Sequence, residues 1–110
     1  MMSSEAHHPQ LVLEITAIET AREAGAAPQV QSTVYGTVPS IGWVQPRLAP
    51  YTYVQAPPDG LYEFDFMAFP PQGGAAKVMT PIRATVVWPP GARGIRVYAS
   101  TNAQESVLTP

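Results

Sequence analysis

Two carboxylates, Glu63 and Asp65, stand between aromatic rings in the segment PPDGLYEFDFMAFPP, residues 57–71, and they are the residues most suited to chemistry. In an extended strand, their Cα atoms are roughly 6.6 Å apart at a rise of about 3.3 Å per residue. The paired carboxyls of glycoside hydrolases lie roughly 5 to 9.5 Å apart. The spacing is therefore compatible with a small glycan-type hydrolase that uses Glu63 and Asp65 as acid and base.

A second interpretation gives the same two acids a structural place. Any strand with acids at positions i and i+2 has this spacing, and a chain of 110 residues has little room to build a substrate cleft around it. In that case the rings face the core, and the acids contact water or pair with Arg83 or Arg96 on neighbouring strands. We expect this interpretation to hold. The sequence thus predicts no catalytic residues, with the hydrolase as the alternative.

Other catalytic and metal-binding chemistry has few candidate residues. Cysteine is absent, which excludes disulfides, thiolate nucleophiles and zinc–cysteine sites. The two histidines, His7 and His8, lie in a polar N-terminal segment that offers no rigid third ligand, so we predict neither a metal site nor a histidine-based triad. The stretch QGGAAK, residues 72–77, lacks the spacing of a phosphate-binding loop. We expect no cofactor.

A tryptophan, an arginine and two tyrosines stand among four prolines in GWVQPRLAPYTYVQAPP, residues 42–58. Exposed Trp, Tyr and Arg often anchor binding surfaces, because they bring a large contact area at a small entropic cost. The alternative is that Trp43 is the core tryptophan and that the tyrosines form one face of a strand. The candidate binding residues are Trp43, Arg47, Tyr51 and Tyr53, and the partner would be a protein, a peptide or a glycan.

The overall composition is that of one globular domain. With 45% hydrophobic and 13% charged residues, the chain can build a core and is too apolar to stay disordered. We expect a flexible tail over residues 1–9 and a single domain over residues 10–110. The six basic residues are scattered, which argues against a nucleic-acid partner. No run has the length of a signal peptide or a membrane span, so we expect a soluble chain, and the sequence does not specify its compartment.

Thirteen prolines favour short strands over helices. Residues 29–38, 60–69, 82–88 and 95–100 alternate with a period of two, and Gly36 is expected to mark a bulge. Residues 11–18 fit a helix face or a strand face, and their β-branched residues favour a strand. A helical turn over AREAG, ending at Gly25, stays open. The Asp59-Gly60 pair and PPGARG, residues 89–94, predict tight turns.

These segments predict an all-β fold. We expect an antiparallel β-sandwich of about seven strands with an immunoglobulin-like layout, and a small β-barrel is the alternative. In the strand over residues 60–69, the alternation sends Tyr62, Phe64 and Phe66 into the core.

The opposite face of that strand carries apolar residues beside the two acids, namely Leu61, Met67 and Phe69. This is a large apolar surface to leave in water. We expect a loop, the C-terminal segment ESVLTP or a second copy of the chain to cover it. The three residues are therefore the candidate interface, with a homodimer as one of the expected arrangements.

The sequence as a whole predicts a non-catalytic interaction or ligand-binding module. The small hydrolase is the second hypothesis. The third is a structural subunit whose strand edges pair with copies of itself, although the many prolines would protect such edges.

Overall fold

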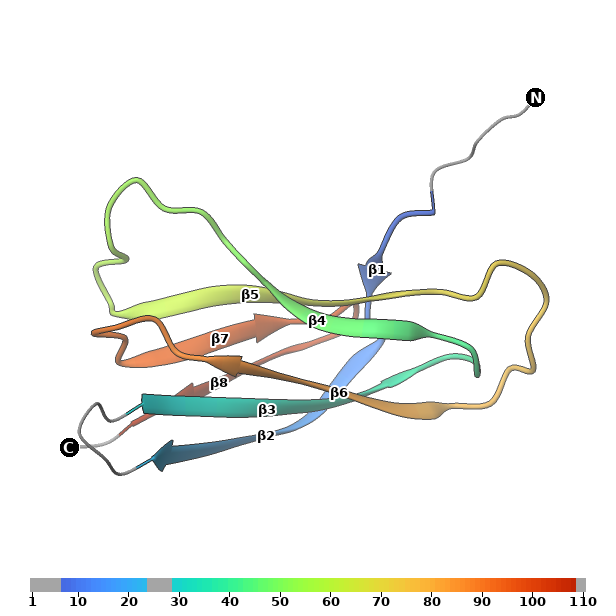
Figure 1. Cartoon of the computed structure of the whole chain (residues 1–110), viewed down its shortest axis with the longest axis horizontal. Coiled ribbons are helices and arrows are strands. Elements are labelled where there is room, and N and C mark those ends of the chain that lie inside the picture. Colours follow the sequence, from blue (N-terminus) through green and yellow to red (C-terminus); the bar gives the residue numbers. More distant parts are fainter. Residues whose placement is uncertain (1–6, 24–28, 109–110) are drawn as a thin grey trace.

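Eight β-strands form two sheets in the computed structural model, which describes residues 7–23 and 29–108 (Figure 1). One sheet has five strands, in the order β1-β5-β7-β8, with β4 also paired to β5, and the other has three, in the order β2-β3-β6. The strands are β1 (Gln10–Leu11), β2 (Glu14–Glu23), β3 (Gln29–Val38), β4 (Val44–Pro50), β5 (Leu61–Phe69), β6 (Thr80–Val87), β7 (Gly94–Tyr98) and β8 (Ala103–Val107).

The two sheets pack against each other, which confirms the predicted all-β sandwich. Strand β7 runs parallel to β5, with Leu61 opposite Gly94 and Asp65 opposite Tyr98, so this pair departs from the antiparallel pattern that we expected. The immunoglobulin-like layout stays a prediction. Within the described ranges, no helix has the length and apolar character needed to cross a membrane.

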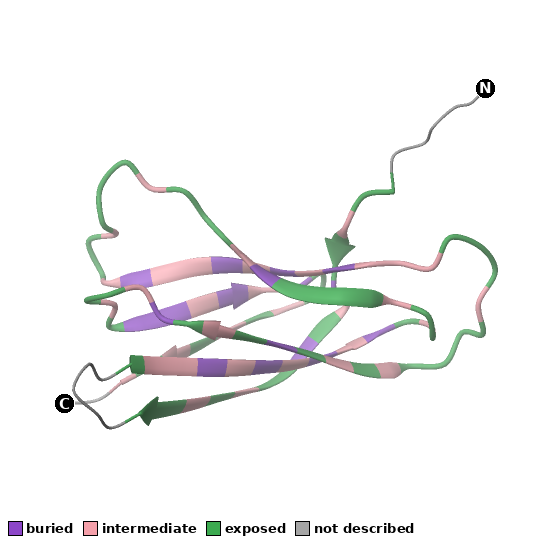
Figure 2. Ribbon diagram, viewed as in Figure 1, coloured by how far each residue is buried: buried purple, intermediate pink, exposed green. Residues whose placement is uncertain are grey.

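Strand β5 supplies the centre of the core. Phe64, Phe66 and Ala68 are buried, as the alternation predicts, whereas Tyr62 is only half-buried at the margin of the core. Figure 2 shows buried and partly exposed residues alternating along β5 and β3. The rest of the buried core comes from both sheets and consists of Val12, Ile15, Val34, Val38, Leu48, Ala84, Trp88, Ile95, Val97 and Ala99.

The chain changes sheets between β1 and β2. Strand β1 pairs with β5, whereas β2 pairs with β3, so the strand interpretation of residues 11–18 is confirmed. A register shift after Ile15 lies opposite Gly36, which confirms the expected bulge. Gly36 is needed there because a Cβ atom would collide with the carbonyl oxygen of Glu14. The predicted AREAG turn lies partly outside the described residues, and Arg22 and Glu23 belong to β2.

Side-chain hydrogen bonds close the sandwich where β2 meets β8. The Asn102 amide accepts a bond from the Ile15 N–H at 2.8 Å and donates one to the Ile15 carbonyl at 2.9 Å. Gln104 Nε2 donates to the same carbonyl at 3.2 Å, and the hydroxyls of Thr20 and Ser106 lie 2.6 Å apart. The backbone of the bulged strand is thereby satisfied by the opposite sheet.

The buried tryptophan of the core is Trp88, whereas Trp43 is partly buried and packs against the margin of the core. The Trp88 indole Nε1–H donates to Ser32 Oγ at 2.8 Å, and Ser32 is fully buried. Ser32 Oγ lies 2.6 Å from Thr20 Oγ1, and Thr20 Oγ1 is in turn hydrogen-bonded to Ser106 Oγ. A buried indole N–H needs such a partner, and the chain of hydroxyls provides it across the two sheets.

We therefore expect Ser32→Ala to lower the free energy of unfolding by about 1–3 kcal/mol, because it leaves the buried indole N–H without an acceptor. Urea denaturation measures the change. Thr33→Ala, at the next residue on the outer face, is the matched control and should change stability by no more than about 0.5 kcal/mol. Equal losses in the two variants would show that the buried bond has no special weight.

Candidate functional site

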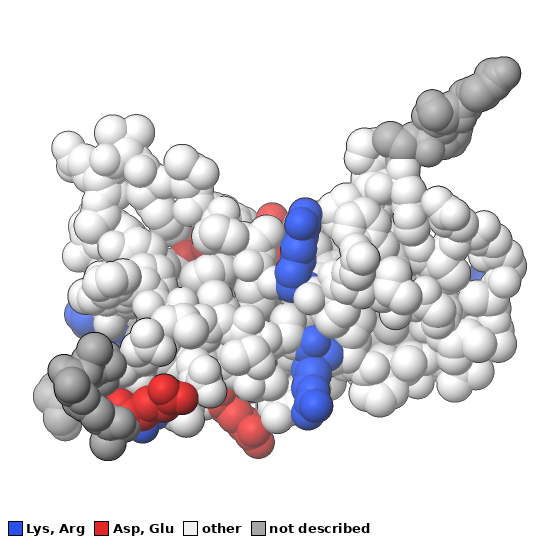
Figure 3. Space-filling view, viewed as in Figure 1, with Lys and Arg blue, Asp and Glu red and all other residues white. Residues whose placement is uncertain are grey.

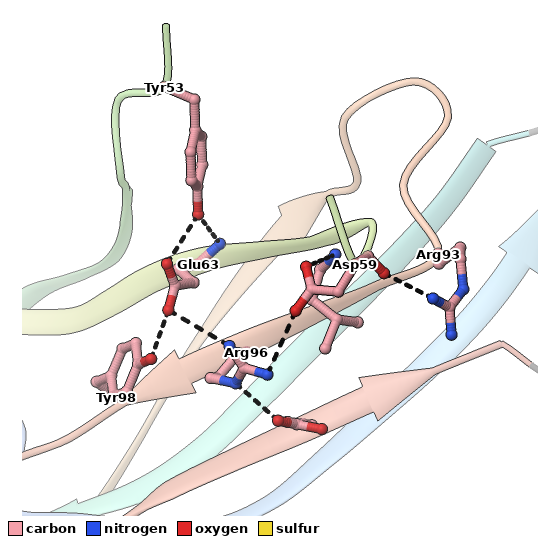
Figure 4. A network of polar contacts seen from close by, with 8 residues as sticks. Tyr53, Asp59, Glu63, Arg93, Arg96 and Tyr98 are labelled. Atoms are coloured by element: carbon pink, nitrogen blue, oxygen red, sulfur yellow. Dashed lines mark hydrogen bonds and ion pairs between the residues drawn. The ribbon is translucent and has the colours of Figure 1, made fainter. Parts of the chain in front are cut away.

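The carboxylate of Glu63 is the centre of a hydrogen-bond network on the outer face of the five-stranded sheet (Figure 4). It accepts bonds from the Tyr98 hydroxyl at 2.5 Å, from the Tyr53 hydroxyl at 3.1 Å and from Arg96 at 3.5 Å. The Tyr53 hydroxyl also accepts a bond from the Glu63 backbone N–H at 3.0 Å. Tyr53 follows β4, so these bonds hold the β4–β5 connection against the sheet.

Asp65 lies two residues after Glu63 on the same face of β5 and is also bound by a tyrosine. Its carboxylate accepts a hydrogen bond from the Tyr51 hydroxyl at 3.0 Å, and the Tyr51 ring stacks on Tyr98 with 5.7 Å between centroids. Partial desolvation, followed by the bond to Asp65, raises the pKa of Tyr51 to about 12. Both tyrosine hydroxyls of the connection therefore serve as donors to the two acids.

Arg96 links the network to its surroundings. It donates to Glu105 on β8 at 2.7 Å and lies 3.5 Å from Glu63 and 3.8 Å from Asp59. The predicted pairing of the acids with Arg96 is therefore confirmed for Glu63. The pairing with Arg83 is wrong, because Arg83 lies on β6 in the other sheet.

The predicted turn at Asp59-Gly60 brings Asp59 to this position. Gly60 has φ of +73°, and its N–H donates to the Pro57 carbonyl at 3.0 Å. Asp59 Oδ1 accepts a bond from the Leu61 N–H at 3.0 Å, which fixes the start of β5. Proline and glycine thus act here as expected from their backbone preferences.

The electrostatics of Glu63 are opposite to those of a general acid. The hydrogen bond from Tyr98 is the largest cause of a lowered Glu63 pKa; partial burial opposes it, and the bonds from Tyr53 and Arg96 add to it. A general acid at neutral pH needs a raised pKa instead. The arrangement therefore favours a structural role for the two acids, and the hydrolase hypothesis gains no support from it.

The four predicted binding residues do not form one surface. Tyr51 and Tyr53 follow the C-terminal end of β4, and Trp43 precedes its N-terminal end. Arg47 lies between them on β4, with its guanidinium carbon 6.0 Å from the centre of the Phe69 ring, a distance typical of a weak cation–π contact. Strand β4 thus separates the tyrosines, which bind the acids, from the tryptophan.

Trp43 lies in a pocket of about 380 Å³ at one end of the sandwich. Trp43 is partly buried against the core, and its Nε1–H donates to Ser40 Oγ at 3.1 Å. The loop before β4 and the loop after β5 meet here, and the Ile41 N–H donates to the Ala76 carbonyl at 3.2 Å. The lining residues are Pro39, Ser40, Trp43, Pro70, Pro71, Gly73, Gly74, Ala75 and Lys77.

Sequence reasoning missed this pocket. It treats residues 72–77 only as a loop, because they match no phosphate-binding pattern. No local signal joins that loop to Trp43, which is some thirty residues away in the chain. The exposed apolar residues around the same end of the sandwich would have been the nearest clue, and they are Ile41, Val44, Val78 and Met79.

The predicted interface residues have different surroundings. Leu61 is buried, and its side chain lies over Gly94, so residues of the same chain cover it. Met67 and Phe69 are half-buried on the outer face, as expected. The His7 ring lies 5.3 Å from the Phe69 ring, and its Nε2 is 2.7 Å from the Pro70 carbonyl oxygen. The N-terminal segment and Arg47 thus cover part of this face, whereas we expected a loop, the C-terminal segment or a second copy of the chain to do so.

In residues 7–23 and 29–108, no group of three or more His, Cys, Asp or Glu side chains is placed to hold a metal ion. Comparison with protein-family models, with curated proteins and with solved structures finds no match for this chain.

The lowered pKa of Glu63 gives a pH dependence with a definite sign. Its contribution to stability is complete above the ordinary glutamate pKa of about 4.3 and is lost as the pH falls through the lower pKa of the folded state. We expect acidification below about pH 5 to destabilise the wild type more than Glu63→Gln or Tyr98→Phe. Urea denaturation at neutral and acidic pH measures the difference.

Tyr35→Phe is the control for this prediction, because it also removes a tyrosine–glutamate hydrogen bond, the one to Glu19, while leaving the Glu63 network intact. It should keep the wild-type pH dependence. Glu63→Gln and Tyr98→Phe with an undiminished acid-induced loss would contradict the role given to this network.

Proposed function

We propose that the protein is a non-catalytic binding module whose ligand site is the Trp43 pocket. The observation that carries this proposal is a partly exposed tryptophan that lines a pocket of about 380 Å³, within the size range of ligand sites. The pocket lies where two loops meet at the end of a rigid sandwich, which is a common place for binding residues. The two acids of β5, by contrast, are engaged by tyrosines of the same chain.

The hydrogen bonds around Trp43 leave its ring face as the contact surface. The indole N–H donates a hydrogen bond to Ser40, and the Ser40 hydroxyl donates one to the Ile41 carbonyl at 3.0 Å. Neither polar group therefore needs a ligand. What remains for a ligand is an aromatic face between prolines, with the chain's single lysine, Lys77, at the wall.

This chemistry favours a peptide or protein segment over a glycan. A sugar site needs several free hydrogen-bonding groups to fix orientation, whereas this pocket and its rim are mostly apolar. A proline or aromatic side chain would stack on Trp43, and a carboxylate would pair with Lys77. The proposed ligand is thus a short acidic segment that carries such a ring.

The two tryptophans allow a direct test, because each gives its own indole N–H signal in a ¹H–¹⁵N NMR spectrum. A panel of acidic peptides with one proline or aromatic residue should move the Trp43 signal, while the signal of buried Trp88 stays in place. Trp43→Ala should weaken binding by roughly 30-fold or more, as for an interface hot spot. Lys77→Ala should weaken it less.

Val54→Ala is the matched control, since Val54 is a fully exposed apolar residue of the β4–β5 connection, away from the pocket. Its affinity should equal that of the wild type. Oligosaccharides are tested beside the peptides, and a response to them alone would reverse the choice of ligand. If Trp43 responds to neither class, the pocket is not the site.

A further inference from the structure

The two sides of the sandwich are closed to different degrees. On one side, hydrogen bonds from Asn102, Gln104 and Ser106 join β8 to β2. On the other side, β4 and β6 are neighbours, yet among the described residues no hydrogen bond joins them. The view of Figure 1 is from this side. Figure 3 shows basic side chains in the middle of this face. Arg47 belongs to β4 and Arg83 to β6.

Backbone orientation tells which groups face this open side. The Trp88 N–H donates to the Val30 carbonyl at 2.8 Å, so even-numbered residues of β6 point their backbone groups towards β3. Because these groups alternate along an antiparallel strand, Arg83, Thr85 and Val87 point theirs towards the open edge. These donors and acceptors form an unpaired strand edge.

Prolines protect β4 but leave most of β6 free. The Tyr51 N–H donates to the Glu63 carbonyl, so odd-numbered residues near this end of β4 face β5 and even-numbered ones face outward. Pro50 falls on the outward side, where proline removes an edge donor at no cost to the sheet, and Pro46 lies in the irregular part of β4 between Val44 and Arg47. On β6, Pro81 removes an edge donor only at the start of the strand.

A pocket of about 470 Å³ lies beside the start of β6. Its lining is mostly apolar, from Tyr35, Pro46, Pro81, Ile82 and the stem of Arg83. At the other end of the strand, Val87 is 49% exposed on the outer face. The strand thus carries a projecting apolar side chain at one end and an apolar hollow at the other.

We propose that two copies of the chain pair antiparallel through β6, forming a dimer with a continuous six-stranded sheet. Centred on Thr85, a two-fold axis places Thr85 against its own copy and Arg83 against Val87 of the second copy, as an isologous interface requires. Each Val87 then lies at the pocket of the other copy. No like charges face each other in this register.

Charge substitutions at Val87 test this register. Because position 87 faces Arg83 of the second copy, Val87→Glu should dimerise more tightly than the isosteric Val87→Gln, and Val87→Lys more weakly than either. The expected spread is roughly 2- to 30-fold in the dimer Kd for two cross-strand pairs. In an Arg83→Glu background the order must reverse, with Val87→Lys tightest. Sedimentation equilibrium measures each Kd.

Backbone substitution tests the pairing independently of charge. Thr85→Pro removes an N–H that points to the open edge, so the monomer should fold while the dimer weakens by roughly 5- to 150-fold. Thr85→Val keeps the N–H and the β-branched shape and should dimerise as the wild type does. Circular dichroism of the Pro variant verifies its fold, and the Val87 series tests the proposal if that variant unfolds.

A wild-type chain that sediments as a monomer at all concentrations up to about 1 mM overturns the proposal. A dimer whose Kd does not change with the charge substitutions at Val87 and Arg83 also overturns it, because such a dimer would use another surface. Neither result bears on the Trp43 pocket, whose ligand is tested on the monomeric or dimeric protein alike.

Discussion

The burial of Phe64 and Phe66 between the two sheets is the interaction on which the rest of the structure depends. Their side chains are 2% and 0% exposed, and they contribute large apolar areas to a small core. Because side chains alternate along a strand, burying these rings forces Glu63 and Asp65 to the outer face. Strand β5 pairs with β4 on one edge and with β7 and β1 on the other, so the same alternation sets the faces of its neighbours.

On the outer face, the acids meet donors of their own chain. The bonds from Tyr51 and Tyr53 fasten the β4–β5 connection to the sheet. The bonds from Tyr98, Tyr53 and Arg96 lower the Glu63 pKa. A carboxylate spacing that resembles that of a hydrolase thus arises from strand geometry alone. The two sites that we propose for interaction lie elsewhere, at the loop end around Trp43 and along the free edge of β6.

Much of the fold could be predicted because its signals are local. The alternating residues of β3, β5, β6 and β7, the turn at Gly60 and the bulge at Gly36 each depend on a few neighbouring residues. Strands β4 and β8 lack an alternation of apolar and polar residue types: two prolines and a bulge interrupt β4, and β8 has the sequence AQESV, with three polar residues in a row. They become strands because β5 and β7 offer them unpaired edges.

The sequence by itself determined which face of each alternating strand is apolar, where the chain turns, and that no cysteine chemistry is available. Only the tertiary structure decided that Trp88 rather than Trp43 enters the core, that Leu61 is buried, and that Tyr51 and Tyr53 bind acids far from Trp43. It also decided that β7 runs parallel to β5 and that loops some thirty residues apart form a pocket. The physical reason is range: φ and ψ preferences and side-chain alternation act over a few residues, whereas the pairing of strands and the packing of two sheets join residues that no local pattern connects.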